Sequence, residues 1–362
     1  MNLSNRVLLT LSVVALLSCC RQHTPKIIGN DSPDLPRVTG IALPKTGAIL
    51  HSGDSVAVEL FPPREGSHID SLVVHAGKEA PFSIPGFPGK FYWHAPNRVG
   101  QLSLKVSVYY NDSLQESHSV SLVVLSDIKP QQYTYKVVRQ YPHDPDAYIQ
   151  GLIYENGMFY ESTGLEGKSS IRIVDPATGK ARKMVPIPSE YFTEGIALLN
   201  DQIYQVTYKN QVGFVYDKHS LEQIRSFDYQ IREGWGLTTD GKLLVMSDGT
   251  SQLYFIEPEF FTQVDKIDVF DNQGMVPSLN ELEFINGKIL ANVYGESYIV
   301  FIDPASGKVT GKLDLQALMP KGSEGNMNMV LNGIAFNPAN GHLFVTGKEW
   351  PVLYEIVLTP TL

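Results

Sequence analysis

Cysteine is almost absent from this chain of 362 residues, and the only two, Cys19 and Cys20, stand near its beginning. The rest of the chain cannot form an internal disulfide, so its stability has to come from burial of apolar side chains. Hydrophobic residues make up 43% of the sequence, which is enough for such burial. The length exceeds that of one average domain, and we therefore expect two domains.

Clustered positive charge is also missing. The formal net charge is −9, with 29 Lys and Arg against 38 Asp and Glu, and the basic residues form no extended cluster. Because binding to phosphate backbones needs grouped Lys and Arg, nucleic acid is excluded as a partner. Peptides or small molecules are the expected ligands.

A membrane-spanning run is missing as well. The apolar run VLLTLSVVALL near the N-terminus is shorter than the about 20 residues that a spanning helix needs. Its place between a basic residue and a small residue is typical of a secretory signal peptide. The sequence Leu16-Leu17-Ser18-Cys19 resembles a bacterial lipobox. We expect residues 1–18 to be a signal peptide and Cys19 to be lipidated; an ordinary signal peptide with two incidental cysteines stays open.

Residues 19–35 are polar and contain proline, which predicts a tether. Acyl chains on Cys19, each contributing about 0.8 kcal/mol per buried methylene, would hold the protein on a membrane while its domains stay in water. We therefore expect an exported protein, lipid-anchored to the bacterial cell envelope on the periplasmic side or at the cell surface.

Residues 36–127 contain alternating strands separated by turn residues. The strands read SVAVELF, SLVVHAG, GKFYWHA, LSLKVSVYY and SVSLVVL. This pattern predicts a β-sandwich of immunoglobulin type. Tyr92 and Trp93 are expected in its core. No group of catalytic residues is visible here, so a spacer or docking role is expected.

Residues 133–362 repeat one unit five times: an apolar strand, a Gly or Asn-Gly turn, a second apolar strand, and a third strand that ends in a turn. The units open with Gln150, Glu194, Trp235, Asn280 and Asn332, which are 44, 41, 45 and 52 residues apart. Periods of about 40 to 50 residues filled with short strands predict a β-propeller, here with five blades. The strand YTYKVVRQYP before the first unit is expected to pair with LYEIVL near the C-terminus and so hide the sheet edges.

Several acidic residues follow apolar strands in Asp-Pro or similar turns. They are Asp175, Asp217, Glu257 and Asp303. We interpret these carboxylates as turn formers and not as ligands. His143 and Asp144 in the segment PHDP are likewise expected to set a turn, with a place at the entrance of the site as the open alternative.

The predicted blades place ten residues at one channel mouth. The first two strands of a blade are antiparallel, so the loop entering the first and the loop leaving the second open on the same face. The entering residues are the five that open the units, and the leaving residues are Gly164, Tyr208, Asp248, Tyr294 and Lys348. A lone Asn usually caps a turn and a lone Trp usually packs, but the set together favours a site for a small polar ligand. No Ser-His-Asp, Cys-His or His-rich metal pattern occurs at these positions, so an enzyme built this way does not supply the nucleophile.

Long segments of the second domain resemble a known family. The segments are PHDPDAYIQGL, YESTGLEGKSSIR, FTEGIAL, EGWGLTTDGKLLVMSDGT, LNELEFINGKILANVY, IDPASGKV and LNGIAFNPANGHLFVTGKEWP. Together they resemble the plant-type glutaminyl-peptide cyclotransferases, here in a lipoprotein form with an additional N-terminal domain. The resemblance implies a five-bladed propeller that converts the N-terminal glutamine of peptides or proteins to pyroglutamate with release of ammonia.

In that reaction the substrate's own α-amine attacks its side-chain amide, so no enzymic nucleophile is needed. The resemblance implies that Glu194 moves protons, while Asn280 and Lys348 stabilise the developing oxyanion. Gln150 is expected to hold the amino group through its carbonyl oxygen. The other expected substrate contacts are Tyr148, Phe192, Tyr208, Trp235, Tyr294 and Asn332. Tyrosine stands at 148, 208 and 294 where the family commonly has phenylalanine or tryptophan, so substrate range is the property least constrained by the resemblance.

Two other functions stay open on the sequence. Glu194, Asp248, Asn280 and Asn332 could offer oxygen ligands to a calcium-sized ion, as in a metal-dependent hydrolase of the lactonase kind. A non-enzymatic propeller that binds peptide N-termini or glycans would also use the aromatic and amide residues. We expect a monomer that requires no cofactor for catalysis, with a structural calcium-like cation in the propeller channel left open.

Overall fold

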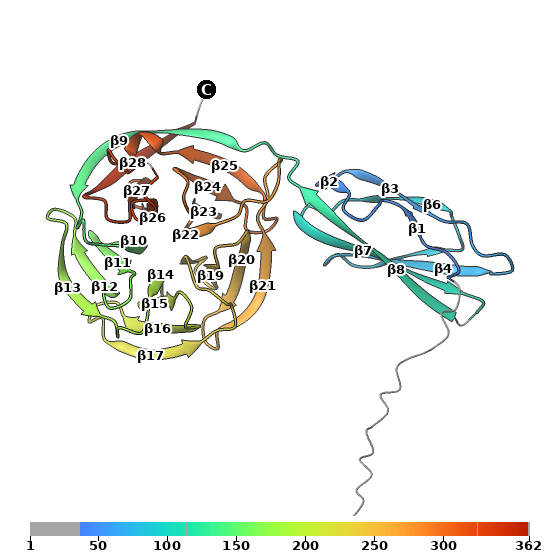
Figure 1. Cartoon of the computed structure of the whole chain (residues 1–362), viewed down its shortest axis with the longest axis horizontal. Helices are drawn as coiled ribbons and strands as arrows, with labels where there is room; N and C mark the ends of the chain where they lie inside the picture. The colour runs from blue at the N-terminus through green and yellow to red at the C-terminus, as the bar shows by residue number, and fades with distance from the viewer. Residues whose placement is uncertain (1–36, 113, 324, 361–362) are drawn as a thin grey trace, which may run out of the picture. The chain divides into compact units, whose positions relative to one another are not determined.

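The computed structural model describes residues 37–112, 114–323 and 325–360. The predicted signal peptide, Cys19 and the tether lie outside these residues. The described residues form strands β1 to β28 and one short 3-10 helix, Gln316–Leu318, without any α-helix, which confirms the all-β prediction (Figure 1). In this part of the chain no helix is long and apolar enough to cross a membrane. The chain from Val38 onward forms one compact unit.

The first eight strands form two sheets. They are β1 (Ile41–Leu43), β2 (Ile49–His51), β3 (Ser55–Leu60), β4 (Ile69–Ala76), β5 (Phe82–Pro85), β6 (Lys90–His94), β7 (Gly100–Tyr110) and β8 (Leu114–Leu125). One sheet has the order β1-β3-β6 and the other the order β2-β8-β7-β4-β5. Their inward side chains make one apolar core, in which Leu72, Val74 and Leu104 are fully buried. Alternation along the strands directs every second side chain into this core.

The prediction for the two aromatic residues of β6 is half right. Trp93 is 5% exposed and belongs to the core, as expected. Tyr92 is 64% exposed, so its predicted core position is wrong. Neighbouring residues of a strand point to opposite faces, and the two cannot both point inward.

The remaining strands form four more sheets. The first three are separate four-stranded antiparallel sheets, each made of consecutive strands. Their strands are β10 (Ile149–Glu155), β11 (Met158–Thr163), β12 (Ser170–Asp175), β13 (Lys180–Pro186), β14 (Thr193–Leu199), β15 (Gln202–Thr207), β16 (Val212–Asp217), β17 (Gln223–Asp228), β18 (Leu237–Thr239), β19 (Leu244–Ser247), β20 (Gln252–Glu257) and β21 (Thr262–Asp268). The last sheet has eight strands, in the order β22-β23-β24-β25-β9-β28-β27-β26. Its strands are β9 (Gln131–Pro142), β22 (Leu279–Ile285), β23 (Lys288–Val293), β24 (Tyr298–Ile302), β25 (Val309–Asp314), β26 (Leu331–Asn337), β27 (His342–Gly347) and β28 (Val352–Pro360).

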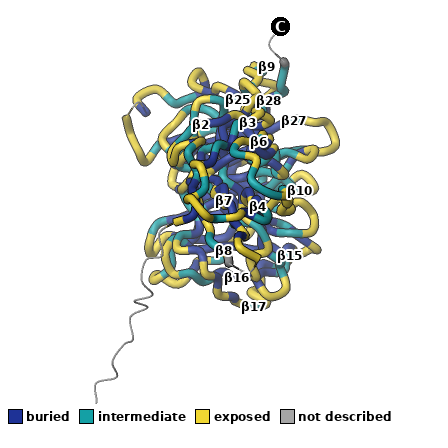
Figure 2. The backbone as a smooth tube through the Cα atoms, turned by 90° about the vertical axis from the view of Figure 1, so that its right-hand side faces the viewer, coloured by how far each residue is buried: buried dark blue, intermediate teal, exposed yellow. Residues whose placement is uncertain are grey.

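The first strands of the repeats meet at a common centre. Strands β10, β14, β18, β22 and β26 each contact the next, and β26 contacts β10 again. Figure 1 shows the sheets arranged around this centre, with their last strands outermost. Figure 2 shows the buried backbone in the interior and the exposed backbone mainly in turns and outer strands.

Strand β9 closes the arrangement. Its first residues, Gln131 to Tyr133, pair in parallel with β25, and Tyr133 to Pro142 pair antiparallel with β28. The predicted pairing of the strand before the first repeat with the last strand of the chain is thereby confirmed. A strand from the beginning of the region thus covers two sheet edges that would otherwise be exposed.

The acidic residues at the strand ends form turns, as predicted. Asp175 Oδ1 accepts a hydrogen bond from the Ala177 amide, and Asp217 Oδ1 accepts one from the Ser220 amide. Glu257 and Asp303 accept equivalent hydrogen bonds two and three residues downstream. Asp144 also caps its own turn through the Asp146 amide. The prediction for His143 is wrong, because its side chain is buried and hydrogen-bonded to the Trp350 carbonyl instead of to the turn.

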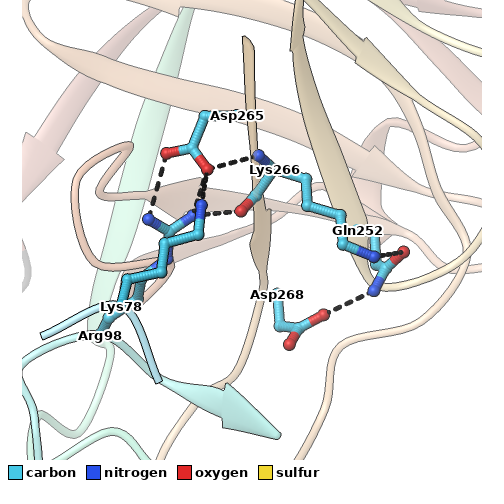
Figure 3. A network of polar contacts seen from close by, with 6 residues as sticks. All are labelled: Lys78, Arg98, Gln252, Asp265, Lys266 and Asp268. Atoms are coloured by element: carbon cyan, nitrogen blue, oxygen red, sulfur yellow. Dashed lines mark hydrogen bonds and ion pairs between the residues drawn. The ribbon is translucent and has the colours of Figure 1, made fainter. Parts of the chain in front are cut away.

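The N-terminal sheets contact the outer strand β21. Both terminal nitrogens of Arg98 donate to the Asp265 carboxylate, at 3.0 and 3.1 Å, and Lys78 pairs with the same carboxylate (Figure 3). The Val99 amide donates to the Ser306 carbonyl at 2.9 Å, and Val99 packs on Phe270. A bidentate pair together with an apolar contact fixes these segments against each other more firmly than isolated surface charges would.

Candidate active site

Four of the innermost strands carry a predicted site residue as their second residue. These residues are Gln150 in β10, Glu194 in β14, Asn280 in β22 and Asn332 in β26. At each of these positions the pairing with the next strand shifts by one residue, as in a β-bulge. A bulge adds an unpaired residue and redirects its side chain. The repeated bulge therefore explains how side chains from four strands turn toward one mouth.

In four of the five units a glycine follows the residue that opens the unit, and it lets the inner strands approach one another. The Gly195 amide donates to the Trp235 carbonyl at 2.7 Å, and a Cβ on Gly195 would lie 2.6 Å from that carbonyl oxygen. A Cβ on Gly236 would lie 1.9 Å from the Asn280 carbonyl oxygen. Larger residues would push the strands apart, so the repeated glycine is a packing requirement at the centre.

The five residues predicted to leave the second strands stand directly after β11, β15, β19, β23 and β27. Gly164 gives room to a neighbour, since a Cβ there would lie 2.5 Å from the Phe192 ring. Asp248 is engaged in its own turn, because it accepts hydrogen bonds from Thr250 and from the Tyr254 hydroxyl at 2.8 Å. Tyr208, Tyr294 and Lys348 are the members of this set that contact the rest of the site.

A hydrogen-bonded chain of side chains leads to Glu194. Asn332 Nδ2 donates to Gln150 Oε1 at 3.2 Å, and Gln150 Nε2 donates to Glu194 Oε1 at 3.0 Å. Asn332 Nδ2 also donates to the Ile149 carbonyl at 2.9 Å, which holds its amide in place. All three side chains are buried. The carboxylate of Glu194 is therefore oriented by two amides that cannot titrate.

Glu194 and Lys348 form the charged part of the site. Burial raises the pKa of Glu194 from its ordinary value of 4.5 to about 8, although the positive charge of Lys348 acts in the opposite direction. Burial also lowers the pKa of Lys348 from 10.5 to about 8, against the effect of the Glu194 charge. Loss of water thus outweighs the mutual attraction of the two groups. Both can exchange a proton near neutral pH, which is the property that proton-transfer chemistry needs.

Aromatic rings enclose these charges. In order around the mouth, the rings are Tyr148, Phe192, Tyr208, Trp235 and Tyr294, and each ring lies 5.6 to 6.3 Å from the next, centroid to centroid. Lys348 Nζ closes the circle, 4.6 Å from the Tyr148 ring and 5.1 Å from the Tyr294 ring. We call these five rings the aromatic wall. The ammonium group of Lys348 lies between its first and last rings.

Asn280 is placed by its backbone. Its carbonyl accepts a hydrogen bond from the Ser247 hydroxyl at 2.7 Å, and its side chain is 1% exposed. The side-chain oxygen accepts no hydrogen bond from the described residues, and the same holds for Asn332 Oδ1. A buried amide oxygen without a partner costs free energy, so these two oxygens are natural contacts for a ligand.

Glu233 belongs to the site and was not predicted from the sequence. Its Oε2 accepts a hydrogen bond from Trp235 Nε1 at 3.2 Å, and its charge contributes to the raised pKa of Glu194. Lys209 lies 3.9 Å from the Glu233 carboxylate and 4.4 Å above the Tyr208 ring. The signal in the sequence is an acidic residue two positions before Trp235, which is too common a pattern to point to a site alone.

Comparison with known proteins identifies the class. A family model described as glutamine cyclotransferase matches residues 108–358. The chain therefore belongs to the glutamine cyclotransferase family. It is 44% identical over 228 residues to the glutaminyl-peptide cyclotransferase of Arabidopsis thaliana, an alignment that covers 62% of this chain and 71% of that protein. The crystal structure of the glutaminyl cyclase of Myxococcus xanthus matches with a TM-score of 0.60 and 34% identity, over 65% of this chain and 100% of that chain.

Proposed function

We propose that this chain is a glutaminyl-peptide cyclotransferase, a transferase that cyclises the N-terminal glutamine of peptides or proteins to pyroglutamate and releases ammonia. Membership of the glutamine cyclotransferase family supports this activity, and so do the two relatives named for it. The observation that carries the chemistry is the buried pair Glu194 and Lys348 inside the aromatic wall, with both pKa values near 8. The hydrolase and the binding propeller that the sequence left open lose their support with this family assignment.

The aromatic wall would hold the glutaminyl side chain curled toward its own amine. Ring formation requires the amine nitrogen to approach the side-chain amide carbon. The substrate loses rotational freedom in that step, and binding in the curled form can lower this part of the activation free energy. Well-oriented intramolecular reactions gain roughly 7–11 kcal/mol in this way. Tyr208, Trp235 and Tyr294 provide flat surfaces from three different repeats, so they can confine the substrate from several sides.

Glu194 would carry the proton. The α-amine, with an ordinary pKa of about 7.7–8.0, has to be neutral to attack. Because the pKa of Glu194 is about 8, transfer of a proton between amine and carboxylate is nearly balanced. The amine nitrogen bonds to the amide carbon and gives its proton to Glu194, which then donates a proton to the amide nitrogen. The carbon–nitrogen bond of the amide breaks, and ammonia leaves. Such a shuttle is typically worth about 10²–10⁴-fold.

Lys348 and Asn280 would stabilise the oxygen of the tetrahedral intermediate. A preplaced cation gains most when the oxygen becomes negative, and Lys348 is held against two ring faces for this purpose. For Gln150 we propose a role other than the one expected from the sequence. Its oxygen already accepts a hydrogen bond from Asn332 and its nitrogen donates to Glu194, so orienting the carboxylate fits better than binding the amine.

The architecture belongs to the same proposal. We assign the ring of sheets to a five-bladed β-propeller over residues 133–362, with the eight-stranded sheet as two blades joined by β9. We assign residues 36–127 to an immunoglobulin-like β-sandwich on the basis of its two packed sheets. For residues 1–35 the proposal is a signal peptide, then Cys19 as lipid anchor and a tether, which makes the protein a monomeric lipoprotein of the cell envelope.

Catalysis on this proposal needs no metal cofactor, because the substrate supplies the nucleophile and Glu194 the proton transfer. A calcium-sized structural cation in the channel is compatible with the unpaired oxygens of Asn280 and Asn332. The carboxylate of Glu281 is already engaged by the Leu152 and Ile334 amides, and the described residues contain no group of three or more His, Cys, Asp or Glu that could hold a metal. Any such cation would therefore bind amide and carbonyl oxygens, and chelation should lower the melting temperature without abolishing turnover.

A coupled ammonia assay on a glutaminyl dipeptide tests the proposed function. Release of one ammonia for each pyroglutamate formed, in the presence of a chelator, is the expected result. Absence of ammonia release at high enzyme concentration would overturn the assignment and favour a binding protein. Loss of all turnover on chelation, restored by calcium, would favour a metal-dependent enzyme.

A further inference from the structure

His143 joins the two segments that carry Tyr148 and Lys348, which are neighbours in the site. It follows β9 and is 5% exposed. Its Nδ1 lies 2.7 Å from the Trp350 carbonyl oxygen, and its own amide donates to the Pro351 carbonyl at 3.0 Å. Five residues further on, the same segment carries Tyr148 into the aromatic wall. None of the proposed catalytic steps uses this histidine.

The segment it reaches carries Lys348. The Glu349 amide donates to the Ala147 carbonyl at 2.9 Å, so a third hydrogen bond joins the same two stretches of chain. The backbone that carries Lys348 and the backbone that carries Tyr148 are therefore held together. Lys348 Nζ lies 4.6 Å from the centroid of the Tyr148 ring. A change in the spacing between these segments would move the ammonium relative to the ring and to the substrate.

A buried carboxylate faces the other nitrogen of His143. Nε2 lies 3.5 Å from Glu161 Oε1, and Glu161 in β11 is 1% exposed. Its two carboxylate oxygens accept no conventional hydrogen bond from the described residues. A carbonyl oxygen can only accept a hydrogen bond, so Nδ1 carries a proton. The negative charge of the Glu161 carboxylate favours a second proton, on Nε2. His143 is thus placed to be an imidazolium with one partner at each nitrogen.

The other charges around His143 are consistent with this form. Burial opposes its protonation, but the Glu161 carboxylate, the Trp350 carbonyl and the Asp144 charge together raise its pKa above 6.5. Asp144 is paired with Arg172 of β12 at 2.8 Å, which leaves Glu161 as the nearest carboxylate without another partner. The charge of this pair is enclosed, so it is not screened by salt as a surface pair would be.

We propose that His143, paired with Glu161, is a positioning residue that sets Lys348 against Tyr148 for the cyclisation step. The proposal rests on the role assigned to Lys348 in the proposed function. Because it acts through Lys348, His143 should affect the turnover step and not the affinity for the substrate. Its contribution should vanish when the lysine is removed.

A double-mutant cycle tests this coupling. His143→Leu is expected to lower kcat about tenfold or more with KM unchanged within about twofold, since a small misplacement in a site can cost up to about 100-fold. His143→Asn can still donate to the Trp350 carbonyl and should recover part of the loss. In a Lys348→Met background, His143→Leu should change kcat by less than about twofold. His219→Asn, at an exposed turn, is the matched control.

The same tenfold loss in the Lys348→Met background would overturn the proposal, as would an effect confined to KM. Failure of Lys348→Met itself to lower kcat would instead count against the proposed function. A second measurement applies if His143→Leu does not fold. The imidazole signal of His143, assigned through His143→Asn, should titrate above 6.5 in the unmodified protein and at lower pH in Glu161→Gln. An unchanged titration in Glu161→Gln would show that the pair is not coupled.

Discussion

Burial brings the pKa values of Glu194 and Lys348 together at about 8, although the charge of each group favours the charged form of the other. In water their values would differ by about six units. The site therefore holds an acid and a base of similar strength, neither of which is strongly committed to its charged form. This similarity to the α-amine of a peptide is the physical basis of the proposed proton shuttle.

Removing the cation should affect turnover more than binding. Lys348→Ala is expected to lower kcat by about 10²–10³-fold, the usual effect of removing one group that stabilises an oxyanion. KM should change little, because the contact strengthens only as negative charge develops. Steady-state kinetics on a glutaminyl peptide gives both constants, with Lys242→Ala on an exposed turn as control. A rise in KM at unchanged kcat would indicate ground-state binding instead.

The aromatic wall should tolerate loss of a hydroxyl but not of a ring. The Tyr294 ring contacts Trp235 at 5.6 Å and Lys348 Nζ at 5.1 Å. Tyr294→Phe keeps both contacts and should stay within about threefold of the original kcat/KM. Tyr294→Ala removes them, and at about 0.5–1.5 kcal/mol for a ring pair plus about 1 kcal/mol for the cation contact, a loss of about tenfold or more is expected. Equal activity of the two variants would remove Tyr294 from the site.

The buried carboxylate of Glu194 should lower the free energy of unfolding at alkaline pH, where it is charged. The pKa of Glu194 is raised on folding, so its contribution is most favourable below pH 4.5 and is lost as the pH rises to about 8. The full loss is roughly 5 kcal/mol. Glu194→Gln removes this cost, and should raise the melting temperature more at pH 9 than at pH 5. Thermal unfolding of both proteins at the two pH values measures the difference. A gain that is equal at both pH values, or larger at pH 5, would contradict the raised pKa.

The predicted anchor concerns a part of the chain outside the described residues. Cys19→Ala should move the protein from the membrane fraction to the soluble fraction of the envelope, while Cys20→Ala should leave it with the membrane. Immunoblotting of fractionated cells compares the two. Retention of Cys19→Ala in the membrane fraction would show that Cys19 is not the attachment point.

The sequence predicted most of the mouth because the repeat fixes where strands begin and end. Glu194 and Lys348 lie in different units, yet their positions relative to the unit placed both beside the same mouth. The repeat also placed Gln150 in the innermost strand of its unit, but its hydrogen bonds to Glu194 and Asn332 could not be predicted, since they depend on how side chains from three different units meet.

Other features depend on contacts that no local pattern specifies. Glu161 points from the second strand of the first unit into the interior, where only the fold shows that His143 is its neighbour. Glu233 enters the site through a bond to a residue two positions away. The wrong prediction for Tyr92 has a simpler cause. Tyr92 and Trp93 are consecutive residues of one strand, so their side chains point to opposite faces of the sheet.

The most direct test of the proton shuttle is kcat for ammonia release by Glu194→Gln. The substitution keeps the size of the side chain and the hydrogen-bonding capacity toward Gln150, and removes only the titratable group. Glu190→Gln, an exposed residue nearby, is the control. We expect kcat to fall at least about 100-fold in a protein that folds normally. Turnover close to that of the unmodified protein would contradict the assignment of Glu194 as the proton carrier.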